Sequence, residues 1–131
     1  MQTRRFVPSI LFVSLLCLVG CAKKEVPPEW TRVTPEGAGD RIVYLDTAHI
    51  VVNAGLVYIT LQSRKAGSAP DSPGAAFGLS HAEANCPANR IDPTALKEDQ
   101  FDASGKKTAM KLVTLSAEES AEVLARSCKG R

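Results

Sequence analysis

The sequence predicts an α+β domain, in which a C-terminal helix packs on a single antiparallel β-sheet and one disulfide staples the two. Three observations predict it: strand-like alternation recurs between turn-forming residues, the last segment carries a helix-capping motif, and two cysteines fall within the folding part. A chain of 131 residues suffices for one domain. Its net charge of +2 and 44% hydrophobic content exclude a polyelectrolyte that binds nucleic acid and a wholly disordered chain.

Residues 1–20 are predicted to be an export signal. Arg4 and Arg5 precede an apolar run from Phe6 to Val19, which is shorter than the roughly 20 residues that a membrane-spanning helix needs. A retained membrane span is the alternative. Because both arginines leave with the signal, the 16 basic residues of the chain fall to the number of its 14 acidic ones.

The end of this run, Leu18-Val19-Gly20-Cys21, resembles the lipobox of bacterial lipoproteins. The resemblance implies cleavage before Cys21, a lipidated Cys21 thiol and an acylated new amino terminus; an ordinary secretory signal that contains a cysteine is the alternative. Two or three acyl chains anchor a protein stably. Residues 21–29 then form the lipidated cysteine and a membrane tether, extended by Pro27 and Pro28. Ala22, rather than an aspartate, follows the lipidated cysteine, and this resembles the outer-membrane sorting pattern of lipoproteins in diderm bacteria.

The folded domain is predicted to span residues 30–131. Strands are expected at Trp30–Val33, Arg41–Leu45, 50–52 and 56–62, separated by a turn at 35–40, a turn or single helical turn capped by Asp46, and a three-residue hairpin connection at 53–55. In the fourth strand Val57, Ile59 and Leu61 form the face expected in the core.

The second half is less regular. Residues 66–76 are small, polar and interrupted by two prolines, which predicts a flexible surface loop, either a binding loop or a plain connection. Residues 77–90 carry Cys86. A strand is expected to end at residues 101–106, in a turn that contains Gly105, and Thr108–Leu115 is expected to be the following strand.

The C-terminal segment predicts a helix. Ser116 and Glu119 fit the capping box, and Ala117, Ala121, Leu124 and Cys128 recur at helical spacing, so we expect these four to face the sheet.

The four cysteines divide by position. Cys17 lies in the export signal and Cys21 in the lipobox, which leaves Cys86 and Cys128 for one disulfide. A metal-binding pair or two free thiols are the alternatives, although neither histidine lies at ligand spacing from these cysteines.

Several of these features together resemble the surface-adhesin protein E family of small envelope lipoproteins, which are built on a β-sheet with a flanking helix. The matching positions are Trp30 with Val33, Tyr44–Asp46 with His49 and Ile50, Gly55, Glu83–Cys86 with Arg90, Gly105 and Cys128. The resemblance implies a non-catalytic lipoprotein, in some relatives displayed on the cell surface and engaging host proteins. Residues 87–93 lack the family's aromatic and basic character, and residues 56–62 lack its second tryptophan, so no ligand-binding residue is carried over.

No residue pattern predicts catalysis, a cofactor or a metal site. His49 and His81 are the only side chains with an ordinary pKa near neutrality, and neither belongs to a triad or metal motif. Capping or packing is the expected role of His49. Residues 37–41 lack the context of a phosphate-binding loop and are expected to form a turn.

The sequence therefore predicts a lipid-anchored, non-catalytic binding or adhesin-like module of the bacterial envelope, placed at the outer membrane in a diderm. Its expected partners are the membrane, through Cys21, and an envelope or host protein, with no nucleic acid. The alternatives are a structural or accessory subunit of an envelope assembly and, more weakly supported, an envelope hydrolase.

Overall fold

The computed structural model describes residues 25–130, so the predicted signal and Cys21 lie outside the described part. Residues 25–29 are exposed and irregular. The elements that follow are β1 (Trp30–Arg32), β2 (Arg41–Asp46), β3 (Val51–Asn53), β4 (Leu56–Lys65), β5 (Phe77–Asn85), β6 (Arg90–Asp92), β7 (Leu96–Phe101), β8 (Lys107–Val113) and α2 (Ala117–Ser127). The described residues thus form mainly an antiparallel sheet with one C-terminal helix, which confirms the predicted class at that level.

The sheet is built around the long hairpin β4–β5. All eight strands pair antiparallel; six of them follow the order β1-β2-β4-β5-β7-β8, which does not close, and β3 and β6 lie off this path. Each central strand has two shorter neighbours end to end on its outer side, β2 and β3 along β4, and β7 and β6 along β5. The sheet consequently ends in a short strand β1 on one side and a seven-residue strand β8 on the other.

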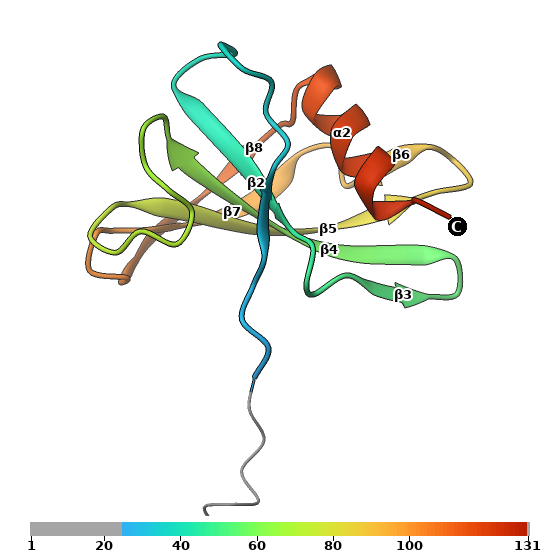
Figure 1. The fold of residues 1–131 in the computed structure, drawn as a ribbon, viewed down its shortest axis with the longest axis horizontal. Helices are drawn as coiled ribbons and strands as arrows, with labels where there is room; N and C mark the ends of the chain where they lie inside the picture. Colours follow the sequence, from blue (N-terminus) through green and yellow to red (C-terminus); the bar gives the residue numbers. More distant parts are fainter. Residues whose placement is uncertain (1–24, 131) are drawn as a thin grey trace, which may run out of the picture.

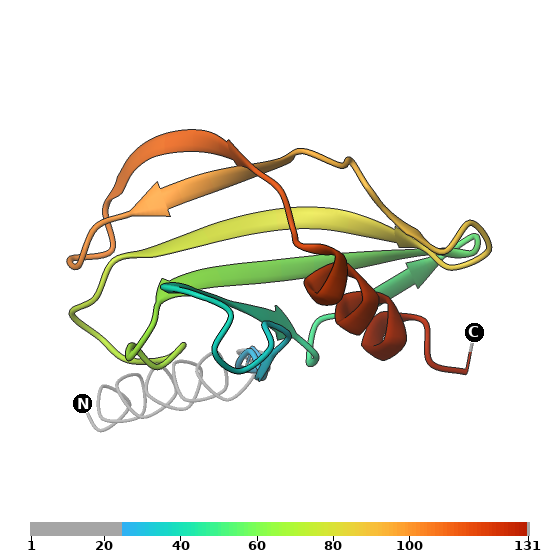
Figure 2. The same cartoon turned by 90° about the horizontal axis from the view of Figure 1, so that it is seen from above.

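One face of the sheet carries the core. Val57, Ile59 and Leu61 are at most 2% exposed, which confirms the core face predicted for this strand. Val123 and Leu124 of α2 belong to the same buried cluster. Figures 1 and 2 show that α2 lies over only part of this face, near the end where β5 meets β6, and leaves the other end of the sheet uncovered.

The hairpin connection between β3 and β4 is shorter than predicted. Asn53 pairs with Leu56, so Ala54 and Gly55 alone form the turn, with φ of 52° and 83°. Two successive residues at positive φ are typical of the two-residue turn whose twist matches that of paired strands. The three-residue prediction was wrong because Ala54 adopts the left-handed conformation that only Gly55 was expected to adopt.

The helix begins as predicted, and the face that it turns to the sheet differs in part from the predicted one. Ser116 accepts a hydrogen bond from the Glu119 backbone N–H at 3.0 Å, and the Glu119 carboxylate accepts one from the Ser116 N–H at 2.9 Å, which confirms the capping box. The buried helix residues are Glu119, Val123, Leu124 and Ser127, whereas Ala117 and Ala121 are exposed. Of the four residues predicted to face the sheet, Leu124 lies in the core and Cys128 packs against it. The prediction was wrong for Ala117 and Ala121, because Glu119 points inward instead and its carboxylate accepts a hydrogen bond from the Thr34 hydroxyl.

Candidate functional site

The predicted disulfide is present. Cys86 follows β5, Cys128 follows α2, and their Cα atoms lie 5.6 Å apart across a bond between the two sulfurs. The prediction is confirmed, and the alternatives of a metal pair and of free thiols do not hold. The bond fastens the end of α2 to the end of the central strand β5, so its role is structural.

The two histidines lie in separate surroundings. His49 Nδ1 is 2.7 Å from the buried Asp46 carboxylate, whose other oxygen accepts hydrogen bonds from the backbone N–H groups of Ala48 and Glu29. His81 Nδ1 lies 3.2 Å from the Thr60 hydroxyl on the neighbouring strand. Within residues 25–130 no group of three or more metal-ligating side chains is assembled. The Asp46 cluster fixes the entry of the chain into the sheet.

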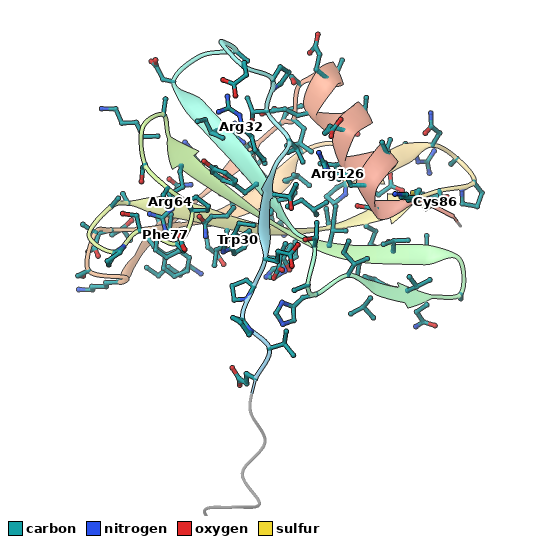
Figure 3. All side chains as sticks on the ribbon, in the orientation of Figure 1. Trp30, Arg32, Arg64, Phe77, Cys86 and Arg126 are labelled. Atoms are coloured by element: carbon teal, nitrogen blue, oxygen red, sulfur yellow. A yellow bond between two sulfur atoms is a disulfide. The ribbon has the colours of Figure 1, made fainter. Side chains whose placement is uncertain are left out.

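The 66–76 connection covers one side chain. Arg64, which is 6% exposed, donates hydrogen bonds to the carbonyls of Pro70 at 2.8 Å and Ser72 at 3.0 Å, and its guanidinium lies 5.0 Å from the centre of the Phe77 ring. Figure 3 shows Arg64 and Phe77 together near the end of the sheet that α2 leaves free. These contacts hold the predicted loop against the sheet, which agrees with a connection rather than a free binding loop.

The uncovered end of the helix-bearing face is hollowed and polar. We call this depression, of about 340 Å³, the polar hollow; its floor includes the small residues Ser63 and Gly78, and Arg41, Lys65, Glu98, Gln100 and Lys111 also line it. Strand register places all these side chains on the face that carries the core. The hydrophobic core thus continues, beyond the reach of α2, into a charged surface.

A buried carboxylate organises the polar hollow. Glu98 is 3% exposed, accepts a hydrogen bond from the Gln100 amide at 2.5 Å, and lies 3.8 Å from the Arg41 guanidinium. Its side chain passes directly over Gly78, where an added Cβ would collide with the Glu98 carboxylate. The absence of a side chain at Gly78 is therefore what gives Glu98 its place.

Replacing Gly78 by alanine is expected to displace Glu98 and to lower the free energy of unfolding by about 1–3 kcal/mol, the usual cost of an added methyl without room. Chemical unfolding measures the loss. Ser80→Ala, at another buried position of the same face of β5, removes an atom instead of adding one and is the matched control. Equal stability of Gly78→Ala and the unaltered protein would contradict the steric argument.

The cations that line the polar hollow outnumber its two carboxylates, Asp40 and Glu98. Lys65 and Lys111 form no ion pair with any residue between 25 and 130, and the Arg41 Nε atom is buried without a hydrogen-bond partner in that same part of the chain. Lys111 lies directly opposite Glu98 in the pairing of β7 with β8, yet the carboxylate bonds to Gln100 instead. The polar hollow therefore offers unsatisfied positive charge beside β8.

Strand β8 forms the open edge of the sheet. It pairs with β7 on one side and has no strand on its other side within the described residues, as the orange strand at the border of Figure 2 shows. Every residue of β8 except Val113 is exposed, including Met110 at 52% and Leu112 at 65%. Unpaired backbone groups beside exposed apolar side chains are a template for pairing with another strand.

The two faces of this open edge differ chemically. Met110 and Leu112 lie on the face opposite α2, with Lys107, which is paired to Asp99 at 3.1 Å. Ala109 and Lys111 lie on the face of the polar hollow. The open edge therefore presents an apolar side and a side with a free cation.

A tight turn leads into the open edge. The Asp102 carboxylate accepts hydrogen bonds from the Ser104 hydroxyl and from the backbone N–H groups of Ser104 and Lys106, and these bonds lower the pKa of Asp102 from its ordinary value. The ionised form is favoured in the folded turn. β8 therefore starts from a position fixed by local bonds, next to the predicted turn at Gly105.

Sequence reasoning placed β8 but not its exposure. The alternation of Lys111 with Met110 and Leu112 marks a two-sided strand, and this pattern could have identified the open edge. No local sequence pattern predicts the polar hollow, because charged residues from four strands line it and only the register of the sheet brings them together. These residues are Arg41, Lys65, Glu98 and Lys111.

Cys21, the predicted lipidation site, lies outside the described residues, and no helix within residues 25–130 has the length and hydrophobicity to cross a membrane. Comparison with family models, with curated proteins and with solved structures found no match. The resemblance to the surface-adhesin protein E family accordingly stays a prediction.

Proposed function

We propose that this protein is a lipid-anchored, non-catalytic binding module of the bacterial envelope, of the surface-adhesin protein E type, and that it engages a protein partner through the open edge β8. The observation that carries the proposal is the exposed strand β8 with Met110 and Leu112 uncovered along it. Adding a strand to such an edge satisfies its free backbone groups and buries its apolar side chains in one step. The lipobox supplies the anchor.

The other short strands are poorer binding edges. β1 and β6 have three residues each and are mostly half-buried; β3 also has three, although Val51 and Val52 are 57% and 46% exposed. A three-residue strand offers few backbone groups to a partner. The length of β8 therefore favours it over the alternatives.

A photo-crosslinking residue tests the binding surface in intact cells. Placed at position 110, it is expected to give a discrete adduct. Placed at position 51, on the short strand β3, it is expected to give none. The two residues are similarly exposed, so the comparison tests the strand on which each one lies. Mass spectrometry of the adduct identifies the partner and the cross-linked segment. Adducts of equal yield at both positions, or at neither, would count against β8 as the binding edge.

Replacing Cys21 by serine is expected to release the protein from membranes and to abolish its lipid mass increment, because serine lacks the thiol that is lipidated. Fractionation and intact-mass measurement provide the readout. Cys17→Ser, within the predicted signal, is the matched control and should leave the mature protein anchored. A Cys21→Ser protein that stays membrane-bound would defeat the anchoring proposal.

The accessory-subunit alternative differs in the side of the envelope on which the domain lies. Protease added to intact cells is expected to degrade an adhesin-like domain displayed outward. A domain that is cut only after the cells are opened would favour the accessory role.

A further inference from the structure

The polar hollow and the open edge lie next to each other, and together they select a partner. A strand added to β8 would alternate its side chains between the two faces of the sheet. On one face its residues would meet Met110 and Leu112, and on the other they would meet Lys111 and the polar hollow behind it. The partner strand must therefore match an apolar face and a cationic face at once.

Charge decides which polar residues fit. Lys111 has no ion pair within the described residues. Arg41 and Lys65 line the same hollow, whose two carboxylates are Asp40 and Glu98, and Glu98 is already engaged by Gln100 and Arg41. Opposite charges in neighbouring strands attract and like charges repel. A carboxylate on the added strand would meet Lys111, whereas a cation there would face the like charge of Lys111.

Charge repulsion also disfavours a second copy of β8 as the occupant of the open edge. If two copies paired antiparallel about Met110, their Lys111 side chains would lie diagonally across the new pair, about 7–8 Å apart on one face. The two polar hollows would then adjoin with their unneutralised cations. Lysine on an edge strand is a common protection against such self-association.

We propose that the open edge accepts an extended acidic segment of a partner protein as an added strand, with its carboxylates on the side of Lys111 and its apolar residues against Met110 and Leu112. This inference rests on the proposed binding function and names the chemistry of the partner. The segment alternates acidic and apolar residues over about the seven residues that β8 offers.

Two peptides test the proposal against the full-length protein in detergent micelles. One alternates glutamate with valine over seven residues, and the other replaces each glutamate by lysine. Fluorescence anisotropy of the labelled peptides is expected to give at least tenfold tighter binding of the acidic peptide at low salt, and the difference is expected to shrink in 0.5 M salt, where charges are screened. Equal binding of the two peptides would overturn the proposal.

Charge reversal locates the contact. Lys111→Glu is expected to weaken binding of the acidic peptide about tenfold and to improve binding of the lysine peptide. Lys97→Glu, on the neighbouring strand but on the opposite face, changes the net charge equally and is expected to have less than a twofold effect. An equal loss of affinity for the acidic peptide in both variants would show that the protein attracts the peptide only through its net charge, and would overturn the proposal.

Amide hydrogen exchange separates this inference from the function on which it rests. The acidic peptide is expected to protect the amides of residues 107–113. If both peptides protect them equally, β8 is a binding edge without charge selection and only the inference fails. If neither peptide does, the edge itself fails; protection that rises with protein concentration alone would make a second copy the occupant and would also overturn the proposal.

Discussion

Replacing Cys86 and Cys128 together by alanine is expected to lower the free energy of unfolding by about 4 kcal/mol. The two cysteines are 42 residues apart in sequence, and the chain entropy lost by closing a loop of that length in the unfolded state sets this magnitude. A domain of this size has only about 5–15 kcal/mol of stability, so the expected loss is a large fraction of the total. The expected loss corresponds to roughly 20 °C in Tm.

Urea unfolding of the double variant, beside the unaltered protein with and without reductant, measures this loss. Reductant should destabilise the unaltered protein to the level of the double variant and leave that variant unchanged. A difference below about 1 kcal/mol between the oxidised protein and the variant would show that α2 is held to β5 by its other contacts.

Replacing Glu119 by alanine is expected to cost about 3 kcal/mol. One carboxylate oxygen accepts the Ser116 backbone N–H, and the other accepts the hydroxyl of Thr34, which itself accepts a hydrogen bond from the Val43 N–H at 2.7 Å. Glu119 and Thr34 are 7% and 6% exposed, so water does not freely replace the lost partner. The variant loses both a helix cap and the link from α2 to β2.

Glu118→Ala is the matched control, since Glu118 precedes Glu119 in the same helical turn but is exposed. Its loss is expected to stay near 0.5 kcal/mol, the value of a charge near a helix N-terminus. Thermal or urea unfolding compares the two variants, and Thr34→Val completes a double-mutant cycle with Glu119→Ala. Equal losses at positions 118 and 119, or a coupling energy near zero, would contradict the proposed link.

The sequence predicted the strands whose buried positions are apolar and missed those whose buried positions are small. Val57, Ile59 and Leu61 mark β4 by alternation, whereas the inward positions of β5 are Gly78, Ser80, Ala82 and Ala84. Larger residues of β5, such as Phe77 and Leu79, lie on the opposite face. The hydrophobic pattern of β5 is thus inverted, and sequence reasoning assigned it no strand.

Small inward residues have a physical reason in this fold. Glu98 occupies the space over Gly78, and the buried cluster of α2 and β4 extends over Ala82 and Ala84. A different pattern obscures β7, of which only the end at Phe101 was expected: its inward face carries the polar Glu98 and Gln100 beside Leu96. A buried glutamate contradicts the rule by which strand and helix faces are recognised, and this one rule failed for Glu98 and for Glu119 alike.

The candidate site was predictable only in part. The pairing of Cys86 with Cys128 followed from counting cysteines, and the strand that became the open edge was expected with its end two residues too late. That this strand would have no outer neighbour depends on the strand order of the whole sheet, which no local pattern contains.

The entry of the chain into the sheet determines how the domain responds to mechanical load. The Glu29 N–H donates to the Asp46 carboxylate at 3.1 Å, and the Glu29 carbonyl accepts from the Thr47 N–H at 2.8 Å, immediately before Trp30 pairs with Asp46. A pull on the preceding segment reaches these bonds, and those that the Thr47 hydroxyl donates to Glu29, before the three residues of β1. The central hairpin β4–β5 and the disulfide at its end lie beyond β2 in the strand order, so tension on the preceding segment acts on β1 before it reaches them.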